Sequence, residues 1–133
     1  MLGPTYRFTI YNATGQTLAA NAVTIKPRRW KYGTDGSLTD EASGVAEVLA
    51  QTATVANAAY KVGTTQDNTV LKYIAGFFEI TVTAPATSNG NVTVYCERSV
   101  DAGVTWPDNG LGSLRKTFNF AAAGTKRDVI EVV

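Results

Sequence analysis

The chain has no histidine and a single cysteine, Cys96, among its 133 residues. The missing histidine removes the commonest general base and the commonest metal ligand in proteins. One cysteine cannot close an intrachain disulfide or build a thiolate zinc site, and no histidine is present to activate it as a nucleophile. Because Cys96 alternates with Val92 and Val94, we expect it to be a small residue of the core.

Charge is also scarce, since charged residues make up 17% of the chain and the net charge is +1. A nearly neutral chain is not attracted to nucleic acid or to an acidic surface by its overall charge. No apolar run approaches the length of a membrane-spanning helix, and the start of the chain lacks the apolar centre of a signal peptide. We therefore expect the protein to be made in the cytoplasm and to bind no membrane. We do not favour nucleic acid as a partner.

Threonine, valine, alanine, glycine and asparagine are abundant, and apolar residues alternate with polar ones in short stretches. About seven to nine such stretches, separated by turn signals, are typical of an all-β protein with an antiparallel β-sandwich, of the jelly-roll or immunoglobulin-like kind. Residues 40–50 are the one candidate for a helix. The expected core residues are Phe78, Ile80, Val82, Val92, Val94, Cys96, Phe118 and Phe120.

The first 50 residues differ from the rest, because two strand-like stretches at residues 6–11 and 18–26 flank a turn signal. This pattern predicts an N-terminal β-hairpin extension. We expect residues 1–50 to form a hairpin and attachment segment, and residues 51–133 to form the sandwich, the two packing as one unit. The apolar hairpin face needs cover from the sandwich or from a neighbouring subunit. The candidate protein interface comprises Tyr6, Phe8, Ile10, Lys26, Arg28, Arg29, Trp30 and Lys31.

Residues 26–31, with the sequence KPRRWK, are the chain's basic cluster. They are compatible with contact to nucleic-acid phosphate, with Trp30 stacking on a base. We favour a protein contact over nucleic acid for this cluster, and a solvated loop or a loop that pairs internally with Asp35, Asp40 and Glu41 remains an alternative.

The eleven carboxylates raise the possibility of a glycosidase, which can work with two acidic residues. Most of them, however, fall in turns or at strand ends, and Glu79 and Glu97 alternate with apolar residues, where solvent exposure explains them. Asp67, Asp101 and Asp108 could offer oxygen ligands to calcium, but no calcium-loop spacing accompanies them. We expect no enzymatic activity, no catalytic residues, no cofactor and no metal.

Residues 99–106 read SVDAGVTW and match the Asp-box pattern S-x-D-x-G-x-T-W, which marks a β-hairpin turn. We assign structural turn roles to Asp101, Gly103 and Trp106, since aspartate can accept backbone hydrogen bonds and glycine can adopt a positive φ. Sialidase-like propellers carry one such motif per blade. A single copy in 133 residues excludes several blades.

Several motifs occur together: ANAAYKVG at residues 56–63, DNT at 67–69, FFEITVT at 77–83, and VTVYCERSVDAGVTWPDNG at 92–110. This arrangement resembles a recurrent type of small structural protein of tailed phages, although Ala102 stands where glycine is usual. The resemblance implies a β-sandwich without enzymatic activity, located in the virion, that contacts major capsid or tail proteins and forms homo-oligomers.

Three functions follow as expectations. The first is a capsid decoration (cement) protein on the head shell, and the second is a tail, neck or baseplate component. The third, from another class, is a carbohydrate-binding module that stacks sugars on Trp30, Tyr32, Tyr95 or Trp106.

Overall fold

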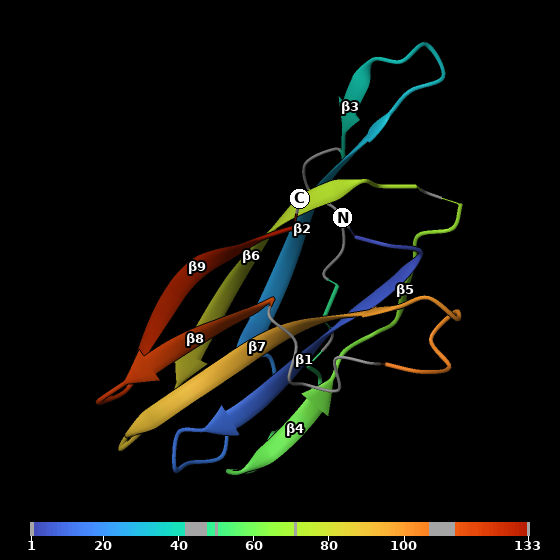
Figure 1. Ribbon diagram of the computed structural model, residues 1–133. Helices are drawn as coiled ribbons and strands as arrows, with labels where there is room; N and C mark the ends of the chain where they lie inside the picture. The colour runs from blue at the N-terminus through green and yellow to red at the C-terminus, as the bar shows by residue number, and fades with distance from the viewer. Residues whose placement is uncertain (1, 42–47, 50, 71, 107–113, 133) are drawn as a thin grey trace.

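The computed structural model describes residues 2–41, 48–49, 51–70, 72–106 and 114–132, which form nine strands. The strands make two antiparallel sheets that pack against each other, as Figure 1 shows. The expected all-β antiparallel sandwich is therefore confirmed. Residues 42–47 and 50 of the expected helix lie outside the described residues.

The first sheet has the strand order β4, β1, β7, β8, and the short β5 also pairs with β1. These strands span Ala59–Val62, Thr5–Ala13, Gly90–Ser99, Arg115–Phe120 and, for β5, Gln66–Asp67. The second sheet has the order β3, β2, β6, β9. Its strands span Leu38–Asp40, Val23–Tyr32, Ala75–Ala84 and Gly124–Val132.

The core lies between the two sheets, because alternation along each strand sends every second side chain inward. Phe8 from β1 and Phe78 from β6 meet at its centre, with ring centroids 4.8 Å apart. Tyr6 packs against Phe78 at 5.8 Å with an edge-on geometry. All eight expected core residues are at most 5% exposed, so this prediction is confirmed.

The expected N-terminal hairpin is wrong. β1 pairs with β7, placing Phe8 opposite Cys96, whereas β2 pairs with β6, placing Ile25 opposite Ile80. The connection between β1 and β2 crosses from one sheet to the other, and Leu18 within it forms a β-bridge with Val55. Pairing in separate sheets lets both apolar faces enter one core, which a detached hairpin cannot do.

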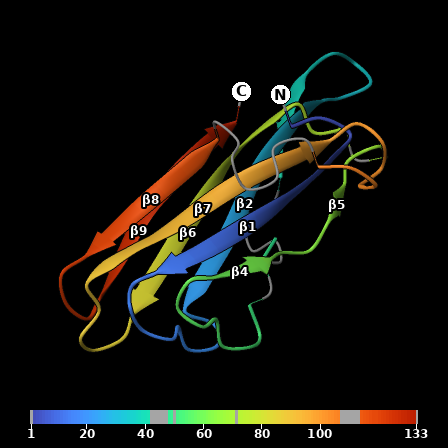
Figure 2. The ribbon, with the colours of Figure 1, turned by 60° about the horizontal axis from the view of Figure 1, so that its bottom comes forward.

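The same topology corrects part of the candidate interface. Tyr6, Phe8 and Ile10 are completely buried between the sheets, so they are not exposed to a neighbouring subunit. Strands on both sides of residue 50 pair with one another, and residues 1–50 contribute strands to both sheets. Figure 2 shows β1 between β4 and β7 in the first sheet.

Candidate functional site

The basic cluster lies on strand β2 and not in a loop. β2 continues through Pro27, which stands opposite Phe78 of β6. Among the described residues, β2 pairs on its other side with β3 at Trp30, Lys31 and Tyr32, so no described strand needs an N–H from Pro27. Because side chains alternate along the strand, the cluster is divided between the two faces of the sheet.

The side chain of Arg29 points inward and lies buried at one end of the core. Its side chain is 7% exposed, and its Nε donates to Oε2 of Glu41 at 2.8 Å while Nη2 pairs with Oε1. Nη1 donates to the hydroxyl of Tyr6 at 2.6 Å. Burial raises the pKa of Tyr6 to about 12, which keeps this phenol neutral. Arg29 is thus unavailable to a partner, contrary to its place in the candidate interface.

Arg28 points outward and forms an exposed ion pair with Asp40 of β3. Its Nη2 lies 2.7 Å from Oδ2 of Asp40, and its Nε donates to the same oxygen at 3.2 Å. Internal pairing with Asp40 and Glu41, one of the alternatives for the cluster, is therefore what the structure shows for Arg28 and Arg29. Asp35 instead accepts hydrogen bonds from the backbone N–H and hydroxyl of Ser37.

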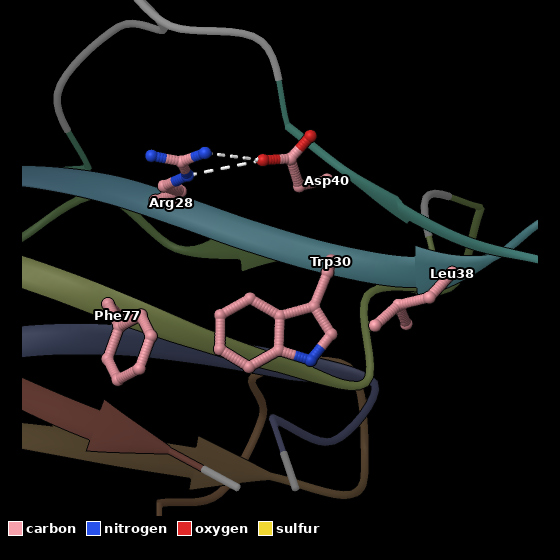
Figure 3. Close-up of a pocket in the computed structure, with 5 residues that line it drawn as sticks. All are labelled: Arg28, Trp30, Leu38, Asp40 and Phe77. Carbon is pink, nitrogen blue, oxygen red and sulfur yellow. Dashed lines mark hydrogen bonds and ion pairs between the residues drawn. The ribbon is translucent and has the colours of Figure 1, made fainter.

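The outer face of the second sheet carries a shallow pocket of about 460 Å³, here called the Trp30 pocket. It is lined by Arg28, Trp30, Leu38, Asp40 and Phe77. Figure 3 shows the rings of Trp30 and Phe77 side by side, and their centroids lie 5.1 Å apart with the planes tilted by 59°. Leu38 and Phe77 are 60% and 40% exposed, so apolar surface is open to solvent here.

The sequence predictions for this pocket included Arg28 and Trp30 but missed Leu38 and Phe77. The signal for Phe77 was present, because it alternates with Glu79 and Thr81 on the face opposite Phe78 and Ile80. An aromatic residue among outward-facing polar ones indicates exposed apolar surface. Leu38 had no such signal, since its position follows from the pairing of β3 with the end of β2.

The Asp-box turn forms as predicted at the end of β7. Asp101 accepts hydrogen bonds from the backbone N–H of Thr105 at 2.8 Å and from the hydroxyl of Ser99 at 2.6 Å. Gly103 has a φ of +87°. The indole N–H of Trp106 donates to the carbonyl of Gly103 at 3.0 Å. The assigned turn roles of Asp101, Gly103 and Trp106 are therefore confirmed.

The turn folds beside a buried ion pair on the outer face of the first sheet. The guanidinium of Arg7 lies 4.0 Å from the ring centroid of Trp106, and its Nε lies 2.6 Å from Oε2 of Glu97. Thr9 donates to the same carboxylate at 3.0 Å. Glu97 is only 2% exposed, so its expected exposure is wrong, whereas Glu79 is exposed as expected. The neighbouring side chains cover Glu97, which strand alternation alone does not reveal.

Replacing Asp101 with alanine should lower the melting temperature by a few degrees, because three donors in the turn lose their acceptor. Hydrogen bonds from Ser99 and then Thr105 lower the pKa of Asp101 to about 2, from an ordinary 3.8. A lowered pKa stabilises the fold above the ordinary value, and this stabilisation is lost as the pH falls from about 4 to about 2. Melts of the parent, Asp101→Ala and Asp101→Asn between pH 2 and 5 would measure the effect. Parallel curves for all three proteins would contradict this role.

Asp67 and Asp108 were the other candidate calcium ligands. Asp67 accepts two hydrogen bonds from Thr69 in its turn, and Asp108 lies outside the described residues. Within the described residues, no three acidic or cysteine side chains gather where they could hold a metal ion. That part of the chain also has no helix long and apolar enough to cross a membrane.

No protein-family model, curated protein or solved structure significantly matches this chain.

Proposed function

We propose that this chain is a noncatalytic structural protein of a tailed-phage particle, most specifically a decoration protein that binds the head shell. The observation that carries the proposal is the Trp30 pocket, an open aromatic surface on the outer face of a sandwich sheet. The motifs at residues 56–110 support the phage assignment by resemblance. A tail, neck or baseplate component is the second candidate, since the same surface could contact a tail ring.

The Trp30 pocket has the composition of a protein-binding surface. Tryptophan and arginine are the residues most enriched at the energetic centres of protein interfaces. Trp30 and Phe77 offer the apolar centre, and the exposed Arg28–Asp40 pair forms a polar border. A surface of this kind binds another protein through apolar contact and is oriented by the charges around it.

The partners of Glu41, Glu97 and Asp101 within the fold support a noncatalytic role. Glu41 and Glu97 are held in buried ion pairs with Arg29 and Arg7. Asp101 is a hydrogen-bond acceptor whose pKa is lowered, whereas a general acid of a glycosidase needs a raised pKa. These three carboxylates are held by partners within the fold.

The geometry of the aromatic residues favours protein contact over sugar stacking. Trp30 and Phe77 are tilted by 59° and do not form a flat platform. Arg7 covers a face of Trp106, whose indole N–H is occupied within the turn. Tyr95 is only 8% exposed. Trp30, Tyr95 and Trp106 are aromatic residues of the kind that can stack on a sugar ring. Their positions do not provide a flat, exposed surface for such stacking.

Replacing Trp30 with alanine should weaken binding to the particle by about thirtyfold, as expected for loss of a 2 kcal/mol interface residue. Phe77→Ala should act in the same direction. Val104→Ala is the matched control, because Val104 is an apolar residue on the Asp-box turn and 80% exposed. Occupancy per particle, measured by quantitative mass spectrometry on purified virions, would report the effect, with thermal melts to confirm folding.

Immunogold electron microscopy of the same particles distinguishes the candidates. Label on the head supports decoration, and label on the tail supports the second candidate. Absence of the protein from purified particles would contradict the virion proposal. Parent-level occupancy of both folded pocket variants would show that attachment uses another surface.

A further inference from the structure

The two sheets protect most of their edges by keeping the edge strands short. β3 has three residues and β4 has four, while β5 has two. β9, in contrast, is an edge strand of nine residues. A long edge strand offers a row of backbone donors and acceptors to another strand. Figure 1 shows β9 at the margin of the second sheet.

β9 is regular over its whole length. It pairs with β6 without interruption from Gly124 opposite Ala84 to Val132 opposite Gly76. It contains neither proline nor a bulge, two of the devices that block an edge, although it does carry another such device, the charged side chains of Lys126, Arg127, Asp128 and Glu131. Residues 124–129 are all exposed, and their contacts include the Lys116–Asp128 ion pair with β8 and Lys126 over the ring of Phe120.

One hydrogen bond shows which backbone groups face the open edge. The N–H of Val129 donates to the side-chain Oδ1 of its own neighbour Asp128 at 2.8 Å, and so is directed away from β6. Because the direction alternates along an antiparallel strand, the backbone groups of Arg127 and Glu131 face the same edge. The side chains of these three residues lie on the outer face, opposite Thr81, Glu79 and Phe77.

We propose that β9 pairs antiparallel with β9 of a second copy of this chain, about a two-fold axis through Val129. This register places Arg127 of each copy opposite Glu131 of the other, so two symmetric ion pairs flank a contact between the two Val129 side chains. Val129 is 43% exposed and would be covered by the contact. Within the described residues, neither Arg127 nor Glu131 has another ion-pair partner.

The charge pattern selects this register over its neighbours. An axis through Asp128 would place Arg127 opposite Val129 and Glu131 opposite Thr125. An axis through Ile130 would place Glu131 opposite Val129. An axis through Arg127 would pair Lys126 with Asp128 twice, but it would also set the two Arg127 side chains opposite each other. The axis through Val129 pairs opposite charges on both sides with no like charges opposed, and directly opposed charge pairs stabilise antiparallel strands. The two second sheets then join into one sheet of eight strands, four from each copy.

In the dimer, the Val129 N–H exchanges the Asp128 carboxylate for a carbonyl of the second copy. Asp128 keeps its ion pair with Lys116 of β8, at 2.8 Å. In the single chain, the Asp128 carboxylate accepts the N–H of Val129 at the edge. In the dimer it still has Lys116 as its partner. This inference does not depend on the place of the protein in a particle.

Charge reversal with rescue tests the register. Arg127→Glu and Glu131→Arg should each weaken dimerisation by about tenfold or more, because each change sets like charges opposite each other twice. The double variant should recover the parent affinity. Lys26→Glu, on the outer face of β2, is the control and should leave the dimer unchanged. Sedimentation equilibrium over a range of concentrations measures each affinity.

A cysteine at the axis gives an independent measurement. Val129→Cys should form a disulfide-linked dimer under mild oxidation, since directly opposite residues in paired strands are about 5.5 Å apart. Glu79→Cys, one strand inward on the same face, should not, because its two copies would be about 14 Å apart. The native Cys96 is buried and does not interfere. A parent chain that stays monomeric to about 1 mM, or a double variant that fails to recover dimerisation, would overturn the proposal.

Discussion

Removal of residues 1–31 should leave a chain that does not fold. The deletion takes away β1, which lies between β4 and β7, and most of β2. It also removes inward-facing side chains such as Tyr6, Phe8 and Ile25. Burying each such side chain contributes about 1.5–3 kcal/mol, and a domain is stable by only about 5–15 kcal/mol in total. Circular dichroism and the dispersion of amide resonances of residues 32–133 would measure the loss.

A split chain provides the matched control for this deletion. Fragments 1–45 and 46–133 together contain every strand, and the β1–β7 and β2–β6 pairs both join one fragment to the other. The two fragments should therefore reassociate when mixed, while the longer fragment alone should remain unfolded. A cooperative melt of residues 32–133 by themselves would instead show that the N-terminal segment is separable from the sandwich.

Strand positions and their buried faces could be predicted from the sequence because they depend on a local period of two. The inward positions of Phe78, Ile80 and Val82 follow from this period alone. The partner of each strand could not be predicted in the same way. β1 and β2 are close in sequence, and a hairpin closes a shorter loop than the actual pairs do. The pairs that form are the ones that bury both apolar faces in one core.

The candidate site shows the same division between local and non-local information. The Asp-box turn was predictable because its donors and acceptors lie within residues 99–106. The opposite directions of Arg28 and Arg29 follow from the continuation of β2 past Pro27, which the local sequence pattern does not indicate. The burial of Glu97 depends on Arg7 and Thr9 from another strand, and no pattern within β7 contains that information.

Replacing Glu41 with alanine should destabilise the fold by about 3–5 kcal/mol, the usual cost of removing one partner from a buried ion pair. Glu41 accepts both the Nε and the backbone N–H of Arg29, at 2.8 and 3.1 Å. Without this carboxylate, a guanidinium that is 7% exposed keeps, among the described residues, the hydroxyl of Tyr6 and the ring face of Tyr73. Urea unfolding of the parent and the variant measures the difference in free energy.

Asp40→Ala is the matched control for Glu41→Ala, because Asp40 precedes Glu41 and pairs with the residue that precedes Arg29. The Arg28–Asp40 pair is 71% and 55% exposed, so its loss should cost at most about 1 kcal/mol. The double variant Arg29→Met with Glu41→Leu should recover much of the stability lost in Glu41→Ala, since no buried charge remains unpaired. Equal, small losses for Glu41→Ala and Asp40→Ala would mean that water reaches Arg29, and that the pair does not hold the end of the core closed.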